Sequence, residues 1–301
     1  MNETPASLVD LHCHSSASGG AVGTPPDIAA FFTRHGYAAF ALTEHQNIRS
    51  LPAACEAAER EGIEYVNGVE MSVRVDDPDA PDRGVDVVGL LFEPTAELER
   101  LAEEGLERAT EWVRTGLARL RERGVVDVSE EELRAGVRKR FGARDVWKRP
   151  YGVVPLGVVL LERGLVRENQ PRSVNDQVRD LLHGVYPESE RPPLPEVGYV
   201  CDVLARAGAV RILAHPGGGR REPSDQQQRR LEWWLDRYVD GIEVYTRKHL
   251  PAYEQMALEV TRRRGRPFSG GSDSHSYHDD GTFSKAPYAC LESLREFKAA
   301  R

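Results

Sequence analysis

Short apolar runs alternate with longer amphipathic segments in the first part of the chain. Apolar runs of about four to eight residues are typical of strands, whereas apolar positions three and four apart indicate helices. We expect strands at 8–14, 38–43, 64–73 and 85–92, and helices near 25–35 and 51–61. Because strands that alternate with helices form βαβ units, this pattern predicts a parallel sheet.

Local end signals support the two expected helices. Thr24 can cap the first helix, with Pro25 at its first position and Asp27 in its first turn, and Gly36 and Gly62 follow the last turns of the two helices. These residue types are typical of helix starts and stops. The helix boundaries are therefore predicted independently of the apolar pattern.

The alternation of strands and helices stops after the fourth strand. From about residue 94, leucines and valines recur at intervals of three and four, and Ser129 with Glu132 forms a capping-box pattern at the start of a further helix. The segment ends in the proline-rich stretch 187–195, which is typical of a linker. We expect residues 95–196 to form a helical insertion that caps a substrate site.

Strand and helix patterns alternate again after the insertion. Strands are expected at 210–214, 241–245 and 267–270, and helices at 196–207, 225–238 and 250–264. The segments 1–94 and 197–301 together supply about seven strands, enough to close a βα barrel. In such barrels the active site lies at the carboxyl ends of the strands.

Size and charge limit the possible partners. The chain has 301 residues, 40% hydrophobic and 29% charged, with a formal net charge of -8. This is an ordinary soluble balance with room for a deep site. The negative charge argues against a duplex DNA surface, although a local basic pocket remains compatible with it. Composition does not predict an oligomeric state.

Cysteine spacing and apolar stretches indicate a cytoplasmic protein with no membrane segment. The four cysteines are far apart and form no C-x-x-C pair, so free thiols in a reducing compartment are expected. The first residues show no signal-peptide pattern, and the longest apolar stretch, 152–161, is short and contains Pro155 and Gly157.

Side chains that bind metals follow the ends of the expected strands. His12 and His14 alternate along the first strand, so both rings point to one face. One strand-end histidine is usually an ordinary polar residue, but here several such clusters recur. They are Thr43-Glu44-His45, Gly68-Val69-Glu70, Ala214-His215-Pro216 and Ser272-Asp273-Ser274-His275. Together they predict one metal cluster.

Imidazoles and carboxylates favour Zn, Mn or Fe, and a carboxylate such as Glu70 can bridge two ions. Two or three divalent ions about 3.5–4 Å apart can hold a bridging hydroxide and polarise a phosphoryl oxygen. Asp10 shares the face of His12 and either orients a histidine or makes a hydrogen bond at the barrel base. Glu243, inside an apolar strand, requires a buried partner, either a histidine of the metal site or an arginine.

The ordered clusters resemble the PHP (polymerase and histidinol phosphatase) superfamily. The resemblance covers the chain before residue 94 and after residue 196, and the middle segment lies where nucleotide phosphatases similar to the 5'-nucleotidase and RNase AM group carry a helical insertion. It implies an α/β fold, a distorted (β/α)7 TIM-like barrel, whose two or three metal ions hydrolyse phosphate esters.

By position, the resemblance implies three metal sites. His12, His14, Glu70 and Asp273 would hold the first ion, Glu70 and His215 the second, and His45 with His275 the third. Asp86 stands where the family usually has a histidine for the second ion, and a carboxylate there favours a harder ion such as Mn. Gly19 cannot supply the ligand that the family has at its position, which leaves two protein ligands for the third ion. The expected catalytic residues are His215, His275 and Asp273, with either histidine steadying the leaving oxygen.

Cations suited to a substrate phosphate lie in two segments. We expect Arg144, Lys148, Arg149 and Arg220 to bind substrate, with Arg140, Arg221 and the aromatic Trp147 nearby. A guanidinium pair and an indole suit the phosphate and base of a nucleotide. An ordinary solvated helix face explains the same residues equally well.

The sequence therefore predicts a metal-dependent phosphoesterase for a small phosphorylated substrate, such as a nucleotide or short oligonucleotide. Three alternatives stay open. One is a histidinol-phosphatase-like phosphomonoesterase, and another is a catalytically silent module that binds metal or nucleotide. The third is an amidohydrolase, which would bridge its metals through a modified lysine, although no lysine ends a convincing strand. His35, His183 and His249 receive no functional assignment, and His278 is expected in a solvated loop unless that loop folds over the site.

Overall fold

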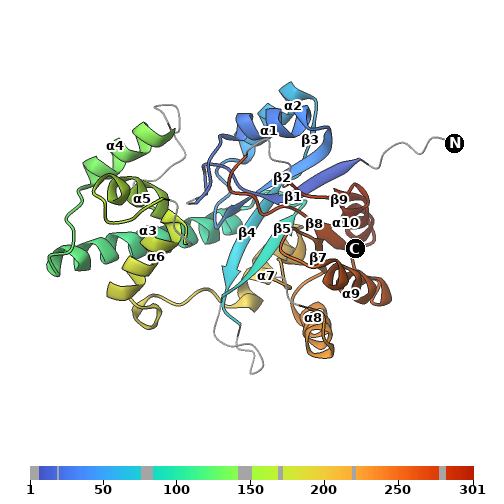
Figure 1. The fold of residues 1–301 in the computed structure, drawn as a ribbon. Coiled ribbons are helices and arrows are strands. Elements are labelled where there is room, and N and C mark those ends of the chain that lie inside the picture. Colours follow the sequence, from blue (N-terminus) through green and yellow to red (C-terminus); the bar gives the residue numbers. More distant parts are fainter. Residues whose placement is uncertain are drawn as a thin grey trace.

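The computed structural model describes residues 7–18, 20–75, 84–141, 151–168, 172–218, 222–277 and 283–301, with only the backbone for 140 and 141. The described chain consists of a barrel and a helical arm that extends from it (Figure 1). We use the element labels of Figure 1 below.

Seven strands in the described residues form the barrel wall. Their order around the wall is β1 (Leu8–Cys13), β2 (Tyr37–His45), β4 (Gly68–Val73), β5 (Val85–Leu90), β6 (Val210–Leu213), β7 (Gly241–Tyr245) and β8 (Phe268–Gly270). The chain after β8 then returns to β1, because the Asp273 amide donates to the His12 carbonyl (2.7 Å) and the His14 amide to the Ser274 carbonyl (3.0 Å). The distorted (β/α)7 barrel is confirmed.

Two short strands lie outside this ring. β3 (Glu64–Tyr65) pairs with β2, and β9 (Ala286–Pro287) pairs antiparallel with β1. The single strand expected at 64–73 is therefore two strands, β3 and β4. Between them the Val66 amide donates to the Phe40 carbonyl, and the Asn67 side chain donates to the Phe92 carbonyl.

The expectation of a fully parallel sheet is wrong at β5, which runs antiparallel to both β4 and β6. The physical reason is that the sequence predicts no crossover helix between β4 and β5. Parallel neighbours need a crossover of about a dozen residues or more, usually a helix, and the segment between Val73 and Val85 contains no predicted helix. This reversal places the amino end of β5, with Asp86, opposite Ser72 near the carboxyl end of β4.

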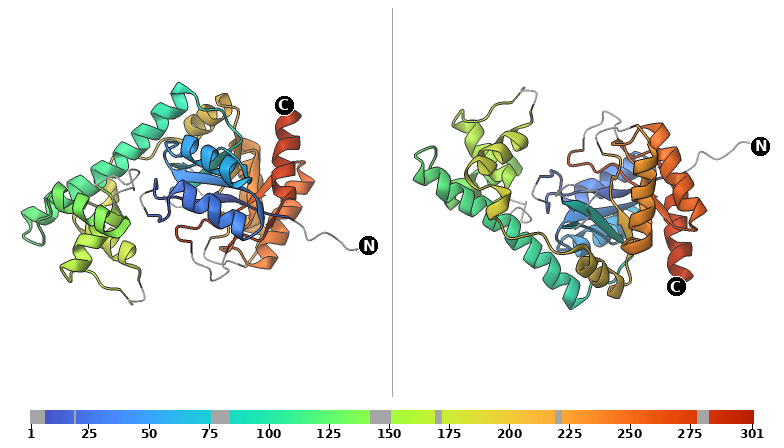
Figure 2. Two further views of the ribbon diagram at one scale, coloured as in Figure 1. Left: turned by 90° about the horizontal axis from the view of Figure 1, so that it is seen from above. Right: turned by 90° about the horizontal axis from the view of Figure 1, so that it is seen from below.

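Helices cover the outside of the barrel (Figures 1 and 2). They are α1 (Pro25–Arg34), α2 (Leu51–Glu61), α7 (Val197–Arg206), α8 (Asp225–Arg237), α9 (Pro251–Arg263) and α10 (Ala289–Ala299). The expected cap of α1 is confirmed, since Thr24 and Asp27 form a reciprocal capping box. The helix α10 was not expected from the sequence, although its buried Cys290, Leu291 and Leu294 follow helical spacing.

The arm contains α3 (Ala96–Glu122), α4 (Glu130–Phe141), α5 (Val153–Glu162), α6 (Val174–Val185) and the 3-10 turn Glu188–Glu190. Early in α3, Leu98 and Leu101 pack into the barrel core. Later in α3, Val113, Leu117 and Leu120 pack into a second core with α5 and α6. Figure 2 shows α3 crossing from the barrel into the arm. One helix therefore joins two separately packed regions.

The arm is closely packed along α3. A Cβ on Gly116 would lie 2.5 Å from the end of the Leu182 side chain of α6, so a larger residue there would require Leu182 to move. The most apolar helix, α5, is mostly buried in the arm core. Among the described helices, none combines the length and apolar character needed to cross a membrane.

Candidate metal centre

The first histidine pair lies at the end of β1, as its alternation predicts. His12 and His14 are both almost completely buried. His12 Nδ1 lies 3.1 Å from Glu243 Oε1, and His12 Nε2 faces Glu70 Oε1 at 3.3 Å. The prediction that Glu243 has a buried partner is confirmed, and of the two expected kinds, a histidine or an arginine, the partner is the histidine His12. A carboxylate on one ring nitrogen orients the other nitrogen, the usual arrangement behind a metal-binding histidine.

Glu70 of β4 lies at the centre of the site. Its two oxygens lie 3.3 Å from His14 Nε2, 2.7 Å from His45 Nδ1 and 3.2 Å from His215 Nε2, in addition to the contact with His12. The side chain is 1% exposed. Residues that are far apart in the sequence thus converge on one carboxylate.

The ligand-type atoms form three overlapping groups, each with its atoms within 4.8 Å of one another. The groups are His12, His14, Glu70 and Asp273; then Glu70, Asp86 and His215; then His14, His45 and His275. Glu70 belongs to two groups, as does His14. The structure therefore brings together all eight residues that the sequence suggested as ligands, and adds His14 to the pair His45 and His275.

Asp86 reaches the site because of the strand reversal at β5. It accepts a hydrogen bond from Ser72 Oγ (2.7 Å) and lies 3.8 Å from His215 Nε2. Burial and the charge of Glu70 raise the pKa of Asp86. Two carboxylates held this close are a favourable arrangement for a cation.

Asp273 has a partner that sequence reasoning missed. Its Oδ1 lies 3.0 Å from His14 Nε2, and its Oδ2 pairs with Lys248 Nζ. Lys248 lies three residues after β7, and the available signal was its position beyond a strand end at the barrel mouth. Arg247 adds a hydrogen bond to the Asp273 carbonyl (3.3 Å).

Strained backbone marks the same region. In the described chain, four non-glycine residues have positive φ, and three of them are Gln46 (51°), His215 (31°) and Asp273 (51°). Such conformations cost of order 1–3 kcal/mol each and persist only where the surroundings hold them. The contacts of the site therefore hold His215 and Asp273 in backbone conformations that direct their side chains toward the other ligand-type residues.

Glu44 is buried beside the ligands but belongs to none of the three groups. It accepts hydrogen bonds from the Ser15 amide (3.1 Å), Ser18 Oγ (2.5 Å) and Ser50 Oγ (3.1 Å). Ser18 Oγ in turn accepts from the His45 amide (3.0 Å). Glu44 therefore fixes the loop after β1 against the end of β2.

Two further polar residues support the backbone of the site. Asp10 Oδ1 accepts from the amides of Ser272 (2.9 Å) and His12 (3.3 Å), so it holds main chain at the base of the site. His249 Nε2 accepts from the Gly217 amide (3.0 Å), and its Nδ1 lies 2.9 Å from the Val244 carbonyl. His249, which had no assignment, thus positions the turn after His215.

The protonation states depend on how the charges face one another. Burial disfavours protonated His12, but Glu243 and Glu70 outweigh it and hold the pKa of His12 well above its ordinary value. Burial likewise disfavours ionised Glu70, but His12 and His45 hold its pKa well below the usual range. Burial, with His45, lowers the pKa of His275 to about 4. Opposite charges therefore stabilise each other at His12 and Glu70, whereas the low pKa of His275 keeps that ring neutral at pH 7.

The donor set fits divalent metal ions. His12 Nε2 and Glu70 Oε2 are buried and have no aligned hydrogen-bond partner in the described residues, although ring nitrogens lie 2.7–3.3 Å from Glu70. Buried polar atoms normally have hydrogen-bond partners. Here His12 Nε2 and Glu70 Oε2 lie close to other ligand-type atoms without forming aligned hydrogen bonds to them, which is the arrangement expected around a cation. Nitrogen and carboxylate oxygen donors together suit transition metals.

Several expected residues lie outside the described part of the chain. These are Gly19, Arg144, Trp147, Lys148, Arg149, Arg220, Arg221 and His278, together with the side chain of Arg140. Their assignments therefore stay predictions.

Sequence comparison identifies the family. The PHP domain matches residues 10–134. A 5'-3' exoribonuclease of Haemophilus influenzae is 31% identical over 210 residues, which are 69% of this chain and 68% of the relative. The chain belongs to the PHP family.

Other PHP relatives match nearly the whole chain. A 3',5'-nucleoside bisphosphate phosphatase of Chromobacterium violaceum is 29% identical over 97% of this chain and 96% of its own length. A phosphoribosyl 1,2-cyclic phosphate 1,2-diphosphodiesterase of Eggerthella lenta is 27% identical over 93% and 97%. These alignments include the helical arm.

Solved structures share the PHP fold seen here. One, named an amidohydrolase of Chromobacterium violaceum with bound sulfate and no metal, has a TM-score of 0.70 and 24% identity, covering 96% of each chain. Another structure, from Bifidobacterium adolescentis, is described as a metal-dependent phosphoesterase by inference. It has a TM-score of 0.71 and 22% identity, covering 97% of each chain. Barrel and arm are therefore a recurring combination.

Proposed function

We propose that this protein is a metal-dependent phosphoesterase that hydrolyses a nucleotide or a short oligonucleotide. The observation that carries the proposal is Glu70. One buried carboxylate belongs to two ligand groups, and a carboxylate shared in this way holds two cations next to each other. Neighbouring cations suit a reaction in which negative charge develops on phosphoryl oxygens.

The proposed ligands follow the three groups. His12, His14, Glu70 and Asp273 would hold one ion, Glu70, Asp86 and His215 a second, and His45 with His275, joined by His14, a third. Zn, Mn and Fe are the candidate metals, and Asp86 favours a harder ion such as Mn. When bound, such ions supply Lewis acidity to a phosphoryl oxygen and lower the pKa of water.

The protein's own residues supply positioning and charge. Glu243 orients His12 and accepts from the His215 amide (2.6 Å). Lys248 neutralises Asp273. In the proposal, His215 or His275 steadies the leaving oxygen, since both side chains are partly exposed at the mouth while His12 and His14 are sealed. Asp273 completes the proposed catalytic set.

The relatives support the substrate class. Their names cover a nucleoside bisphosphate, RNA and a phosphoribosyl cyclic phosphate, and all three reactions break a phosphoester. Each substrate carries a ribose beside the reacting phosphate. A ribose phosphate is therefore the chemistry that we propose for this chain.

The test is a substrate panel on protein of known metal content. Chelator-treated protein is reloaded separately with Mn, Zn or Fe, and bound metal is measured by mass spectrometry. Nucleoside monophosphates, nucleoside 3',5'-bisphosphates, 5'-phosphorylated short RNA, ribose cyclic phosphate, histidinol phosphate and a small amide are assayed for hydrolysis.

We expect at least two ions per chain and release of phosphate or nucleotide from a ribose phosphate. Preference for histidinol phosphate or the amide would replace the proposed function. Nucleotide binding without turnover under every metal would identify a silent module instead.

A further inference from the structure

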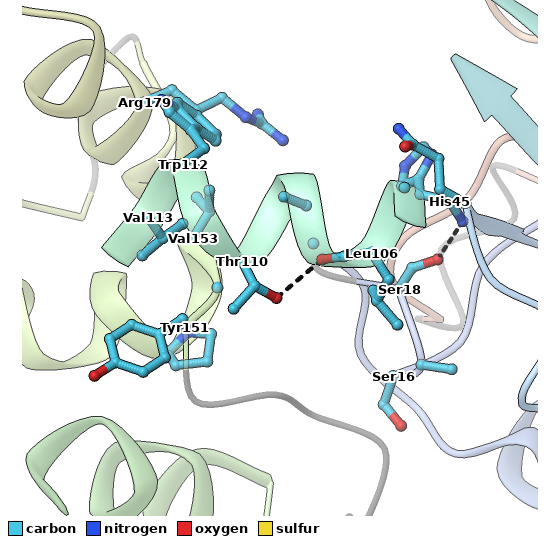
Figure 3. Close-up of a pocket in the computed structure, with 17 residues that line it drawn as sticks. Ser16, Ser18, His45, Leu106, Thr110, Trp112, Val113, Tyr151, Val153 and Arg179 are labelled. Carbon is cyan, nitrogen blue, oxygen red and sulfur yellow. Dashed lines mark hydrogen bonds between the residues drawn. The ribbon is translucent and has the colours of Figure 1, made fainter. Parts of the chain in front are cut away.

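A cavity lies between the barrel mouth and the helical arm. The loop after β1 (Ser16, Ser18 and Gly20) and His45 form its barrel side, and α3, α5 and α6 form its arm side (Figure 3). Its volume is about 170 Å³. Pockets for whole drug-sized ligands are roughly 300–1,000 Å³, so this cavity suits one part of a ligand whose remainder lies over the metal centre.

Arg179 of α6 brings a positive charge across the cavity. In Figure 3 its side chain extends from the arm toward the barrel side of the cavity. Arg179 Nη2 and His275 Cδ2 lie 4.0 and 3.5 Å from one point, the position that a Cβ on Gly20 would take. The guanidinium is therefore a near neighbour of the proposed metal ligands, although it belongs to the arm.

The charge of Arg179 is available to a ligand. Its side chain is 46% exposed, and it forms an ion pair with Asp176, one turn earlier on the same helix, at 3.2 Å. Exposed pairs of this kind contribute little, typically about 0–1 kcal/mol. A phosphate, which offers several acceptor oxygens to a planar guanidinium, competes well against such a pair.

The arm side of the cavity offers an aromatic ring. Trp112 of α3 lines the cavity beside Val113 and Val153. Its ring is held by His183, with centroids 5.3 Å apart, and by the guanidinium of Arg191, 4.8 Å from the centroid. Trp112 Nε1 is buried, and no acceptor among the described residues binds it. The indole therefore offers the cavity a fixed aromatic surface, which suits a flat group such as a nucleobase.

We propose that this cavity binds the part of the nucleotide that is not cleaved. Arg179 binds a second phosphate, separated by one ribose from the phosphate at the metal centre, and the nucleobase lies in the cavity with Trp112. The inference rests on the proposed function and names its specificity determinant. Both a nucleoside bisphosphate and the 5'-phosphorylated end of RNA have this chemistry.

The kinetic test compares substrates with one and two phosphates. For Arg179→Gln we expect kcat/KM for adenosine 3',5'-bisphosphate to fall about 10- to 100-fold through KM, since a charge-assisted hydrogen bond is lost. The effect on p-nitrophenyl phosphate, which has one phosphate and no ribose, should stay within about threefold. Arg179→Lys should recover only part of the loss.

The matched control is Arg172→Gln. Arg172, two residues before α6, pairs with Asp180 of that helix, is 62% exposed and is not among the residues that line the cavity. It should leave all substrates unchanged. A 5'-phosphorylated dinucleotide is run alongside the bisphosphate, and the larger loss between the two identifies which source of the second phosphate the site prefers. An equal loss for p-nitrophenyl phosphate and the bisphosphate overturns the inference.

A binding measurement separates the inference from the proposed function. Calorimetric titration of the metal-loaded protein with adenosine 3',5'-bisphosphate and with adenosine, which has no phosphate, needs no turnover. If no phosphoester is hydrolysed but Arg179→Gln selectively weakens bisphosphate binding, the subsite stands and the hydrolase proposal fails. If hydrolysis proceeds and Arg179→Gln does not distinguish the ligands, the hydrolase proposal stands and the subsite is wrong. Trp112→Phe should weaken adenosine binding in the supporting case.

Discussion

The barrel mouth and the helical arm use charged residues in opposite ways. At the mouth, His12, Glu70 and Asp273 are at most 5% exposed and face one another. In the arm, the core is apolar, and ion pairs such as Arg163 with Glu132 and Lys139 with Glu162 lie on the outside. Buried charges cost free energy unless they are paired, whereas exposed pairs cost and contribute little.

In the proposed function, the mouth performs the chemistry and the arm recognises the substrate. The mouth combines buried charge with positive φ at His215 and Asp273, which is tolerable only where many contacts fix the geometry. The arm offers exposed side chains on a separately packed frame, where substitutions alter affinity without disturbing the ligands. We therefore expect variants at the mouth to abolish the reaction and variants in the arm to redirect it.

The largest expected effect comes from Glu70→Gln, which keeps the shape of the side chain and removes its charge. Loss of the carboxylate shared by two groups should lower kcat about a thousandfold or more and reduce the number of bound ions, because the metals contribute several kcal/mol of charge stabilisation. Metal analysis and kcat on the best substrate measure this. Glu56→Gln, on the exposed face of α2, is the control. Full metal content with ordinary turnover would contradict a central role for the mouth.

A stability variant tests whether the arm is separate from the barrel. Leu182 of α6 is completely buried in the arm core, so Leu182→Ala should destabilise the arm by about 2–5 kcal/mol. Calorimetry should show an early transition while the metal content stays unchanged. Leu165→Ala, at a 45% exposed position, should shift the melting curve little. Simultaneous loss of both transitions and of metal would show that barrel and arm unfold as one unit.

Lys248→Met is expected to have the smallest effect of the three. It leaves Asp273 without its cation, and the loss of one charged interaction should lower kcat about 10- to 100-fold. The loss should be equal for substrates with one and two phosphates, in contrast to Arg179→Gln. Lys139→Met, in the arm and 71% exposed, is the control. A loss of activity confined to the bisphosphate would show that Lys248 acts in substrate recognition and not in the reaction.

Local patterns were sufficient for much of the barrel. The strand at β7 matches its expected bounds, and the Thr24 cap starts α1 as the residue types indicate. Pairing direction was beyond local patterns, because it depends on which strands become neighbours. The reversal at β5 was missed for this reason. The final helix α10 is different, because its apolar spacing is local and was overlooked in the last segment.

The candidate site shows the same division. The sequence showed histidines and carboxylates at the ends of the expected strands. The family resemblance then indicated which of them share a metal site. The role of Glu44 as a loop anchor, the pairing of Lys248 with Asp273 and the support of Gly217 by His249 were not visible. Each of these contacts joins segments whose approach is determined by barrel closure.

The sequence by itself determined most of the inventory of this protein: most of the strands and helices, the helical character of the middle of the chain, and the ligand-type residues at strand ends. Tertiary structure alone decided that Glu70 is shared between groups, that Asp86 reaches the site and that Arg179 faces the mouth from another region. The physical reason is range. Propensity and periodicity act between residues a few positions apart, whereas a metal centre depends on angles between side chains brought together when the barrel closes.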